Sequence, residues 1–266
     1  MSQISILGCG WLGFPLAKTL LQNGFTVKGS TTSADKLALL ENAGIQAFLI
    51  SLKAEETQGK AMDFLENSTI LIIDIPPKLR GLEKENFVAK IQKLVPFIEQ
   101  STVEKLLFIS STSVYSDKEK HITETVLPNP DTESGIQLLA SEKLLQSNKS
   151  FQTTILRFGG LIGEDRHPIK FLAGRKDVEN PEAPINMIHQ DDCIGIILKI
   201  ITTHSWGETF NAAAPFHPSR EDYYIHKAIE LGLAAPTFNH EKPSVGKIID
   251  SGKVEGLGYT FLRNDF

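Results

Sequence analysis

The chain is short of several residue types, and each shortage excludes a class of protein. It has only two cysteines in 266 residues, Cys9 and Cys193, and their spacing fits neither a disulfide framework nor a zinc site. No apolar run approaches the length of a membrane span, and no basic segment with a cleavable apolar stretch stands at the N-terminus. We therefore expect a cytoplasmic protein without membrane contact, whose cysteines are small buried apolar residues.

Positive charge is also scarce. Lys and Arg total 27 against 32 Asp and Glu, a formal net charge of −5, which argues against a nucleic-acid partner because such a partner needs a basic face. The apolar fraction of 41% and the charged fraction of 22% are ordinary for a globular protein. The length accommodates one large α/β domain, or one domain with a smaller lobe.

Glycines spaced G-x-G-x-x-G stand between a predicted strand at 3–7 and a predicted amphipathic helix at 11–22. Gly8 permits a sharp turn, Gly10 lets the backbone approach a pyrophosphate, and Gly13 lets the helix pack closely on the strand. The N–H groups and the positive dipole end of the helix then face the phosphates. This loop predicts dinucleotide binding, with a purely structural βα turn as the alternative. The predicted binding residues are Gly8, Gly10, Trp11, Leu12 and Gly13.

Predicted strands and helices alternate through the first half of the chain. The further strands are at 25–30, 46–51, 69–74, 105–110 and 151–157, and the helices at 33–42, 84–100 and 132–147. Near-continuous apolar strands suit a parallel sheet that is covered on both faces. We therefore expect an α/β fold with a doubly wound, Rossmann-type parallel sheet.

The second half is less regular. A short strand at 185–189 precedes a helix that begins at Asp191 or Asp192, and Ser219 resembles the start of a capping box for a helix ending near Gly232. We expect a dinucleotide-binding domain over 1–157 and a small substrate-facing lobe over 158–266, with 185–203 returning to the core domain.

The end of the second strand bears on the choice of cofactor. NAD-binding folds usually place an acid there to hold the ribose diol, but this chain has Ser30, Thr31 and Thr32, which we expect to contact the cofactor. No arginine is present to bind a 2′-phosphate, and Lys36 is the nearest substitute. The cofactor is expected to be NAD or NADP, with a slight preference for NADP.

A run of hydroxyl side chains, Ser110-Ser-Thr-Ser-Val-Tyr115, follows the fifth strand. The carboxyl end of a strand faces the ligand crevice in open α/β sheets. The run is either a hydrogen-bonding surface for a substrate or a set of turn residues.

With this run, the chain resembles the extended short-chain dehydrogenases/reductases, the NAD-dependent epimerase/dehydratase type. The resemblance rests on the glycine loop, on Ser110–Tyr115, on Leu156-Arg-Phe-Gly-Gly-Leu-Ile-Gly163, on Ile188-His-Gln-Asp-Asp192 and on Leu257-Gly-Tyr259. It implies a Rossmann domain, a cofactor extended from 8–13 toward 111–115, and a Ser111 hydroxyl that binds the substrate oxygen.

The resemblance fails at the family's acid–base pair, a Tyr and a Lys four residues apart on one helix face. The ammonium would lower the pKa of the Tyr from about 10 toward neutrality. Aligned on Glu142, the Tyr position is Ser134 and the Lys position is Leu138, and no Tyr lies between Tyr115 and Tyr223. The usual pair is absent.

Other residues are candidates for the lost role. Ser111 and Ser113 are expected to position the substrate, and Tyr115 and His167 are the candidate acid–base groups, although Tyr115 is mainly structural in the family and a loop histidine is commonly a surface residue. Arg157 is expected to be a scaffold ion-pair residue.

Three functions stay open. The leading one is an NAD(P)-binding oxidoreductase or epimerase/dehydratase-like enzyme for a small, sugar-derived substrate, with a homodimer left open. The second is a non-catalytic NAD(P) redox sensor, which the missing pair favours. The third is a β-hydroxyacid dehydrogenase, which the glycine loop also resembles but which would require an all-helical second domain.

Overall fold

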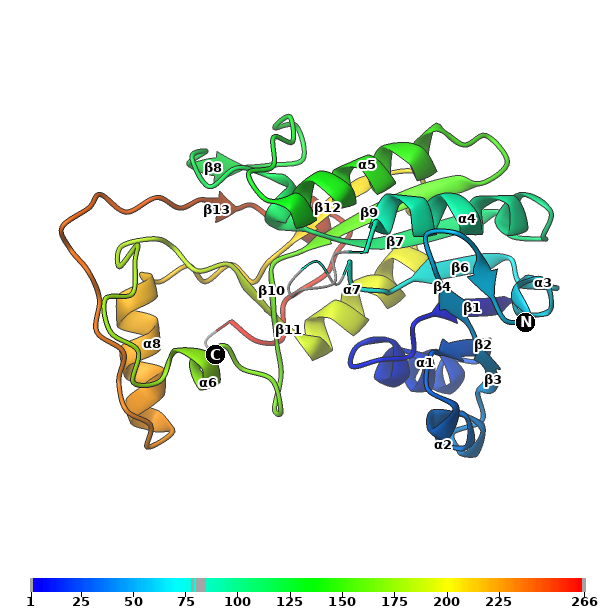
Figure 1. Ribbon diagram of the computed structural model, residues 1–266, viewed down its shortest axis with the longest axis horizontal. Helices are drawn as coiled ribbons and strands as arrows, with labels where there is room; N and C mark the ends of the chain where they lie inside the picture. The colour runs from blue at the N-terminus through cyan, green and yellow to red at the C-terminus, as the bar shows by residue number, and fades with distance from the viewer. Residues whose placement is uncertain (1, 78, 80–84, 265–266) are drawn as a thin grey trace.

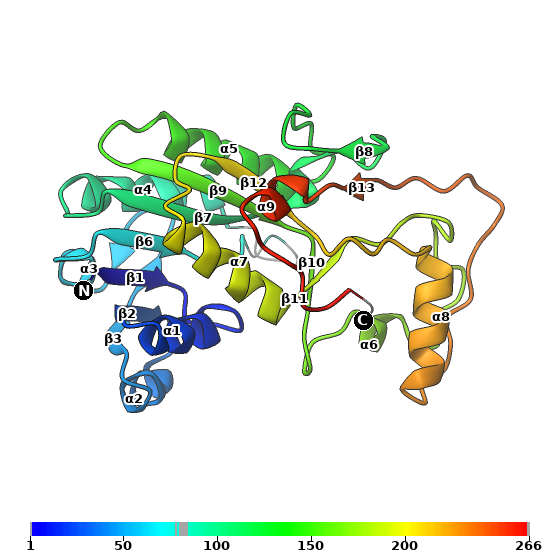
Figure 2. The ribbon, with the colours of Figure 1, turned by 180° about the vertical axis from the view of Figure 1, so that it is seen from behind.

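A seven-stranded parallel sheet forms the centre of the computed structural model, which describes residues 2–77, 79 and 85–264 (Figures 1 and 2). The strand order is β12-β9-β7-β6-β1-β2-β3, and every neighbouring pair is parallel. The strands are β1 (Gln3–Leu7), β2 (Thr26–Thr31), β3 (Gln46–Leu49), β6 (Ile70–Ile73), β7 (Lys105–Ser111), β9 (Gln152–Phe158) and β12 (Thr209–Ala212). The strand order reverses between β1 and β6, so the predicted doubly wound Rossmann fold is confirmed.

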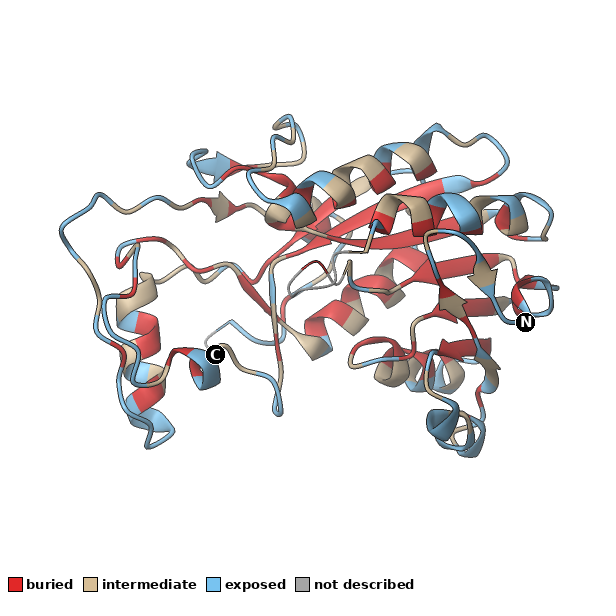
Figure 3. Cartoon of the chain, viewed as in Figure 1, coloured by how far each residue is buried: buried red, intermediate tan, exposed pale blue. Residues whose placement is uncertain are grey.

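Helices cover both faces of the sheet, which accounts for the wholly apolar strand β6 and for the buried residues of its neighbours β1 and β7. One face carries α1 (Gly13–Gln22), α2 (Leu37–Asn42) and α7 (Gln190–Thr202), and the other carries α3 (Ala61–Leu65), α4 (Phe87–Glu99) and α5 (Glu133–Ser147). Each layer has its own apolar core, and the buried residues concentrate along the central strands (Figure 3).

Capping residues decide where the predicted helices begin. The helix predicted over 84–100 begins at Phe87, because the Asn86 side chain accepts the Ala89 N–H (residue 84 lies outside the described residues). In the same way, the Thr132 side chain accepts the Gly135 N–H and starts α5. The apolar repeat in the sequence locates α4, and the helix predicted over 132–147 is α5.

A smaller lobe lies beyond the carboxyl ends of the strands (Figure 1). It contains α6 (Ile169–Leu172) and α8 (Arg220–Glu230), which pack around a separate core that includes Tyr223 and Tyr224. Ser219 caps α8 by accepting the Asp222 N–H, as the capping box predicted. Strands β10 (Gly160–Ile162) and β11 (Met187–His189) form a parallel pair between the lobe and the sheet.

One strand of the main sheet was not predicted. Residues Thr209–Ala212 lie in the segment that the sequence division gave to the lobe, yet they form β12 beside β9. Its sequence, Thr-Phe-Asn-Ala, lacks the continuous apolar run that marks β6. The short elements that remain are β4 (Ser51–Leu52), β5 (Thr57–Gln58), β8 (His121–Ile122), β13 (Ile248–Ile249) and α9 (Gly252–Gly256). Within the described ranges, no helix is both long and apolar enough to cross a membrane.

Candidate functional site

The glycine loop has the geometry that phosphate binding requires. Gly8 has φ +108°, and a Cβ there would lie 2.2 Å from the Asp74 carbonyl oxygen. A Cβ at Gly13 would lie 2.2 Å from the Gly8 carbonyl oxygen, so α1 packs directly on the loop. At Gly10, in contrast, a Cβ would meet no atom within 4 Å. The first and third glycines therefore serve packing, and Gly10 faces open space.

The start of α1 offers free hydrogen-bond donors. In the described part of the chain, the backbone N–H groups of Trp11 and Leu12 have no acceptor, whereas the neighbouring Gly10 N–H is bonded to Gly8 O and the Phe14 N–H to Gly10 O. Unpaired N–H groups at the positive end of a helix dipole form an anion-binding site. The loop therefore fits the pyrophosphate of a dinucleotide.

A cavity of about 600 Å³ opens beside this loop, at the carboxyl ends of β1, β2 and β6. Its size is in the range of small-molecule and cofactor sites. The apolar part of the cavity wall consists of Ile50, Leu52, Ile75 and Phe87, and it suits a flat nucleobase. A hollow of similar size at Glu104 and Gln152 lies at the amino ends of β7 and β9, where open α/β sheets do not bind ligands.

Hydroxyl and ammonium groups line the end of the cavity next to β2. The Ser30 hydroxyl accepts the Gly8 N–H and the Thr31 hydroxyl accepts the Ser33 N–H, so both hydroxyls also hold the loops in place. Thr32 is exposed at the rim. Two exposed lysines, Lys36 and Lys53, line the same end. The sequence singled out Lys36, but Lys53 is distant in sequence and was missed.

Asp74 was also missed as a site residue. It follows β6, lines the cavity beside Gly8 and Gly10, and its carboxylate accepts the Gly13 N–H. Burial raises the pKa of this carboxyl to about 7, although the Gly13 N–H and the charge of Arg166 lower it. A carboxyl group that titrates near neutrality therefore lies beside the phosphate-binding end of α1. Its position directly after an apolar strand was the only sequence signal.

The predicted hydroxyl surface is partly used by the fold itself. The Ser111 hydroxyl accepts the Ser113 N–H and caps the short 3-10 turn Thr112–Val114, and both serines are half-buried. The start of α5 packs against this turn, since a Cβ at Gly135 would lie 2.2 Å from the Ser113 carbonyl oxygen. Ser111 ends β7, the strand beside β6, and thus lies at the same sheet edge as Asp74.

Tyr115 does not line the cavity. Its side chain is 2% exposed, and its hydroxyl donates to Asn211 Oδ1 (3.1 Å) and accepts from Arg157 Nη1 (2.6 Å). Burial raises the pKa of this phenol, although Arg157 opposes the rise. These contacts enclose the hydroxyl within the protein.

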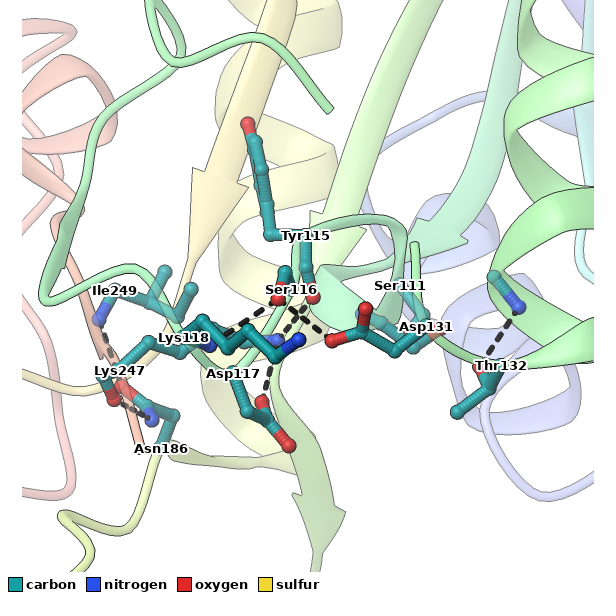
Figure 4. A network of polar contacts seen from close by, with 12 residues as sticks. Ser111, Tyr115, Ser116, Asp117, Lys118, Asp131, Thr132, Asn186, Lys247 and Ile249 are labelled. Atoms are coloured by element: carbon teal, nitrogen blue, oxygen red, sulfur yellow. Dashed lines mark hydrogen bonds and ion pairs between the residues drawn. The ribbon is translucent and has the colours of Figure 1, made fainter. Parts of the chain in front are cut away.

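A second network ties the hydroxyl segment to the lobe (Figure 4). The buried Lys247 ammonium donates to the Tyr115 carbonyl oxygen (2.5 Å) and pairs with Asp117 (2.8 Å). Asn186 bridges the Lys247 carbonyl oxygen and the Ile249 N–H. The chain that returns from α8 therefore fixes the loop that follows Ser113.

Helix α5 holds Ser134 and Leu138, the two positions that the resemblance assigned to an acid–base pair. Leu138 is 3% exposed and packs in the core under α4 and α5. Ser134 is half-buried in the first turn of α5. Neither side chain supplies a charge or a phenol.

His167 lies in the lobe. Its Nδ1 accepts the Ile169 N–H, which leaves the proton on Nε2, 2.7 Å from the Tyr223 hydroxyl. Burial lowers the pKa of His167 to about 4, and Lys227 contributes to the decrease. The imidazole is therefore neutral at physiological pH, and it does not line the cavity beside the glycine loop.

Comparisons with known proteins bear on the family and the fold of this chain. No protein-family model matches the sequence. The chain is 34% identical to protein YeeZ of Escherichia coli over 268 aligned residues. The alignment covers 100% of this chain and 97% of YeeZ.

Two solved structures illustrate the structural likeness. The UDP-glucuronic acid 4-epimerase of Bacillus cereus in complex with NAD has a TM-score of 0.80 over 98% of this chain and 92% of the epimerase, at 20% identity. A short-chain dehydrogenase/reductase superfamily protein of Agrobacterium tumefaciens with bound NAD has a TM-score of 0.77 over 98% of this chain and 93% of its own, at 17% identity. The fold is thus that of the extended short-chain dehydrogenases/reductases, as the motifs predicted.

Proposed function

We propose that this chain, which belongs to the family of the Escherichia coli protein YeeZ, binds a nicotinamide dinucleotide and acts as an epimerase/dehydratase-like oxidoreductase. One observation carries the proposal. The Trp11 and Leu12 N–H groups are free and lie next to the open space at Gly10, beside a cavity of about 600 Å³. The bound dinucleotide would supply hydride transfer, and this chain's own residues bind and orient it.

Among the two cofactors, we favour NADP. Lys36 and Lys53 line the end of the cavity next to β2, and no acid stands at the end of that strand to hold a ribose diol. Neither lysine has an ion-pair partner among the residues that the structure describes. Two such ammonium groups favour an extra phosphate over a diol.

For the substrate, we propose a small, sugar-derived molecule that Ser111 and Ser113 orient at the edge of the sheet. The acid–base group is not the usual Tyr. Of the candidates, Tyr115 has its hydroxyl held by Arg157 and Asn211, so we assign it a structural role. His167 is then the remaining candidate, and it would act from the lobe, because it contacts the Tyr223 hydroxyl and does not line the cavity beside the glycine loop.

A non-catalytic redox sensor is the second candidate. The observation that favours it is the apolar, buried Leu138 at the position where the family has its lysine. The lobe argues against the third function, because β10, β11 and β13 lie within the second half, which is therefore not all-helical.

Titration with NADH and NADPH tests the proposal. The chain has two tryptophans, and Trp206→Phe leaves Trp11 in the loop as the sole indole reporter. We expect saturable calorimetric binding and quenching of Trp11, with NADPH bound more tightly than NADH. The variants Lys36→Ala and Lys53→Ala should lose about tenfold in NADPH affinity and little in NADH affinity. No saturable binding of either cofactor would contradict the proposal.

A second assay separates the enzyme from the sensor. Oxidised cofactor bound to the protein is mixed with UDP-sugars, and absorbance of reduced nicotinamide is recorded for the wild type and for Ser111→Ala. Because an epimerase or dehydratase returns the hydride to the sugar, the converted sugar is measured in the same samples. An enzyme gives reduced nicotinamide or converted sugar, and Ser111→Ala diminishes either one, whereas a sensor binds the cofactor and converts no sugar.

A further inference from the structure

The indole of Trp11 connects the phosphate-binding loop to the lobe. Its Nε1–H donates to Asp165 Oδ1 (2.8 Å), and a Cβ at Gly163 would lie 2.8 Å from its ring. Gln190 Nε2, at the start of α7, donates to the Trp11 carbonyl oxygen (2.6 Å). The turn at 163–166 is therefore packed directly on the loop that would hold the pyrophosphate.

Arg166, the last residue of this turn, lies over the indole. Its guanidinium carbon is 4.9 Å from the centre of the Trp11 ring. Stacking on an aromatic face orients the guanidinium plane while its N–H groups stay available. In the described ranges, these N–H groups have no acceptor and the side chain forms no ion pair, and Arg166 is exposed. The arginine is thus oriented but unpaired.

The charge at this end of α1 shows why a cation is needed. The Asp74 carboxylate accepts the Gly13 N–H, and in its ionised form it places negative charge where the dinucleotide would add more. The charge of Arg166 reaches this carboxylate and stabilises its ionised form. The thiols of Cys9 and Cys193 also interact with Asp74, but burial raises their pKa values, so both are neutral. Arg166 is the cation whose charge lowers the pKa of Asp74.

We infer that Arg166 pairs with the pyrophosphate of the bound dinucleotide and offsets the charge of Asp74. The lobe then supplies one ligand to a cofactor that the sheet otherwise holds, and Trp11 is the platform that keeps this ligand in place. The inference rests on the proposed cofactor binding. Arg166 would thus contact the cofactor directly, and Trp11 would be the residue that positions it.

The test compares Arg166→Met, Arg166→Lys and the matched control Lys170→Met by calorimetric titration with NADH and with ADP-ribose. Lys170 is an exposed cation four residues further on, whose ammonium contacts the Asp165 carbonyl oxygen. We expect Arg166→Met to weaken both ligands by about tenfold or more, because a charge-assisted hydrogen bond is lost. Arg166→Lys should recover part of the affinity, and Lys170→Met should bind like the wild type.

Salt dependence gives a readout that a purely structural role would not change. Affinity of the wild type should fall with added salt, and the fall should be shallower in Arg166→Met. Thermal melting confirms that each variant folds. Equal losses in Arg166→Met and Lys170→Met, or wild-type affinity in Arg166→Met, would overturn the inference while cofactor binding stands. Failure of the wild type to bind NADH, NADPH and ADP-ribose would overturn the proposed function itself.

Discussion

Arg157 and Glu142 form a buried bidentate ion pair that links β9 to α5. Arg157 Nε lies 3.0 Å from Glu142 Oε1, and Nη2 lies 2.5 Å from Oε2. Ser110 donates its hydroxyl hydrogen to the same carboxylate (2.5 Å), and Arg157 Nη1 donates to the Tyr115 hydroxyl. The expectation that Arg157 is a scaffold ion-pair residue is confirmed. Through the hydrogen bond from Ser110, the pair also holds β7, the strand that ends at Ser111.

Breaking this pair should destabilise the protein strongly. Arg157→Met leaves the Glu142 carboxylate buried without a cation, so we expect the free energy of unfolding to fall by about 3–5 kcal/mol. Chemical denaturation measures the change. The double variant with Glu142→Leu should lose less than the sum of the two single changes, because no unpaired charge remains. Additive losses would show that the two residues act independently.

Tyr115→Phe separates a structural from a catalytic hydroxyl. The change leaves Arg157 Nη1 and Asn211 Oδ1 each without a buried partner. We expect a loss of about 1–3 kcal/mol in unfolding free energy and unchanged NADH affinity. Unchanged stability combined with loss of turnover would instead assign Tyr115 to the chemistry.

Gly10→Val should abolish dinucleotide binding without unfolding the protein. The valine side chain would enter the open space that the pyrophosphate would occupy. Gly256→Val is the matched control, because Gly256 is also exposed with no atom within 4 Å of a Cβ and lies in α9. In calorimetric titrations of the two folded variants, Gly256→Val should bind the dinucleotide like the wild type, and Gly10→Val should not bind it. Wild-type affinity in Gly10→Val would exclude the glycine loop as the phosphate site.

Asp74 should make stability depend on pH. The pKa of this carboxyl rises from 3.8 to about 7 on folding. Between these values the folded protein keeps a proton that the unfolded chain releases, so the free energy of unfolding falls as the pH rises through this window. Asp74→Asn should abolish the decrease, since its amide oxygen can still accept the Gly13 N–H. Denaturation of both proteins at about pH 5 and about pH 8 measures the difference, and parallel changes would contradict the assignment.

His167 should act in the opposite direction. Its pKa falls from 6.5 to about 4 on folding, so the unfolded chain binds the proton first. Stability should therefore fall as the pH falls through this window. In the wild type this slope and that of Asp74 partly cancel, but His167→Gln removes one of them. The free energy of unfolding of this variant, measured by denaturation, should fall more steeply with rising pH than that of the wild type between about pH 4 and about pH 6.5.

Much of the candidate cofactor site could be predicted from the sequence because it is local. Gly8, Gly10 and Gly13 belong to one turn, and Ser30 to Thr32 end one strand, so short-range spacing located both. Asp74 carried no such signal, because an acid after a strand acquires a role only when the neighbouring strand places it against Gly13.

The sequence by itself determined the alternation of strands and helices, the glycine loop, the acid-free end of β2 and the absence of any Tyr between Tyr115 and Tyr223. Each of these depends on residue type and on spacing within one element. Only the tertiary structure decided that Thr209–Ala212 completes the sheet, that Tyr115 is enclosed by Arg157 and Asn211, and that Arg166 stacks on Trp11. These contacts join residues 42 to 155 positions apart, and long-range packing sets them without leaving a periodic mark in the sequence.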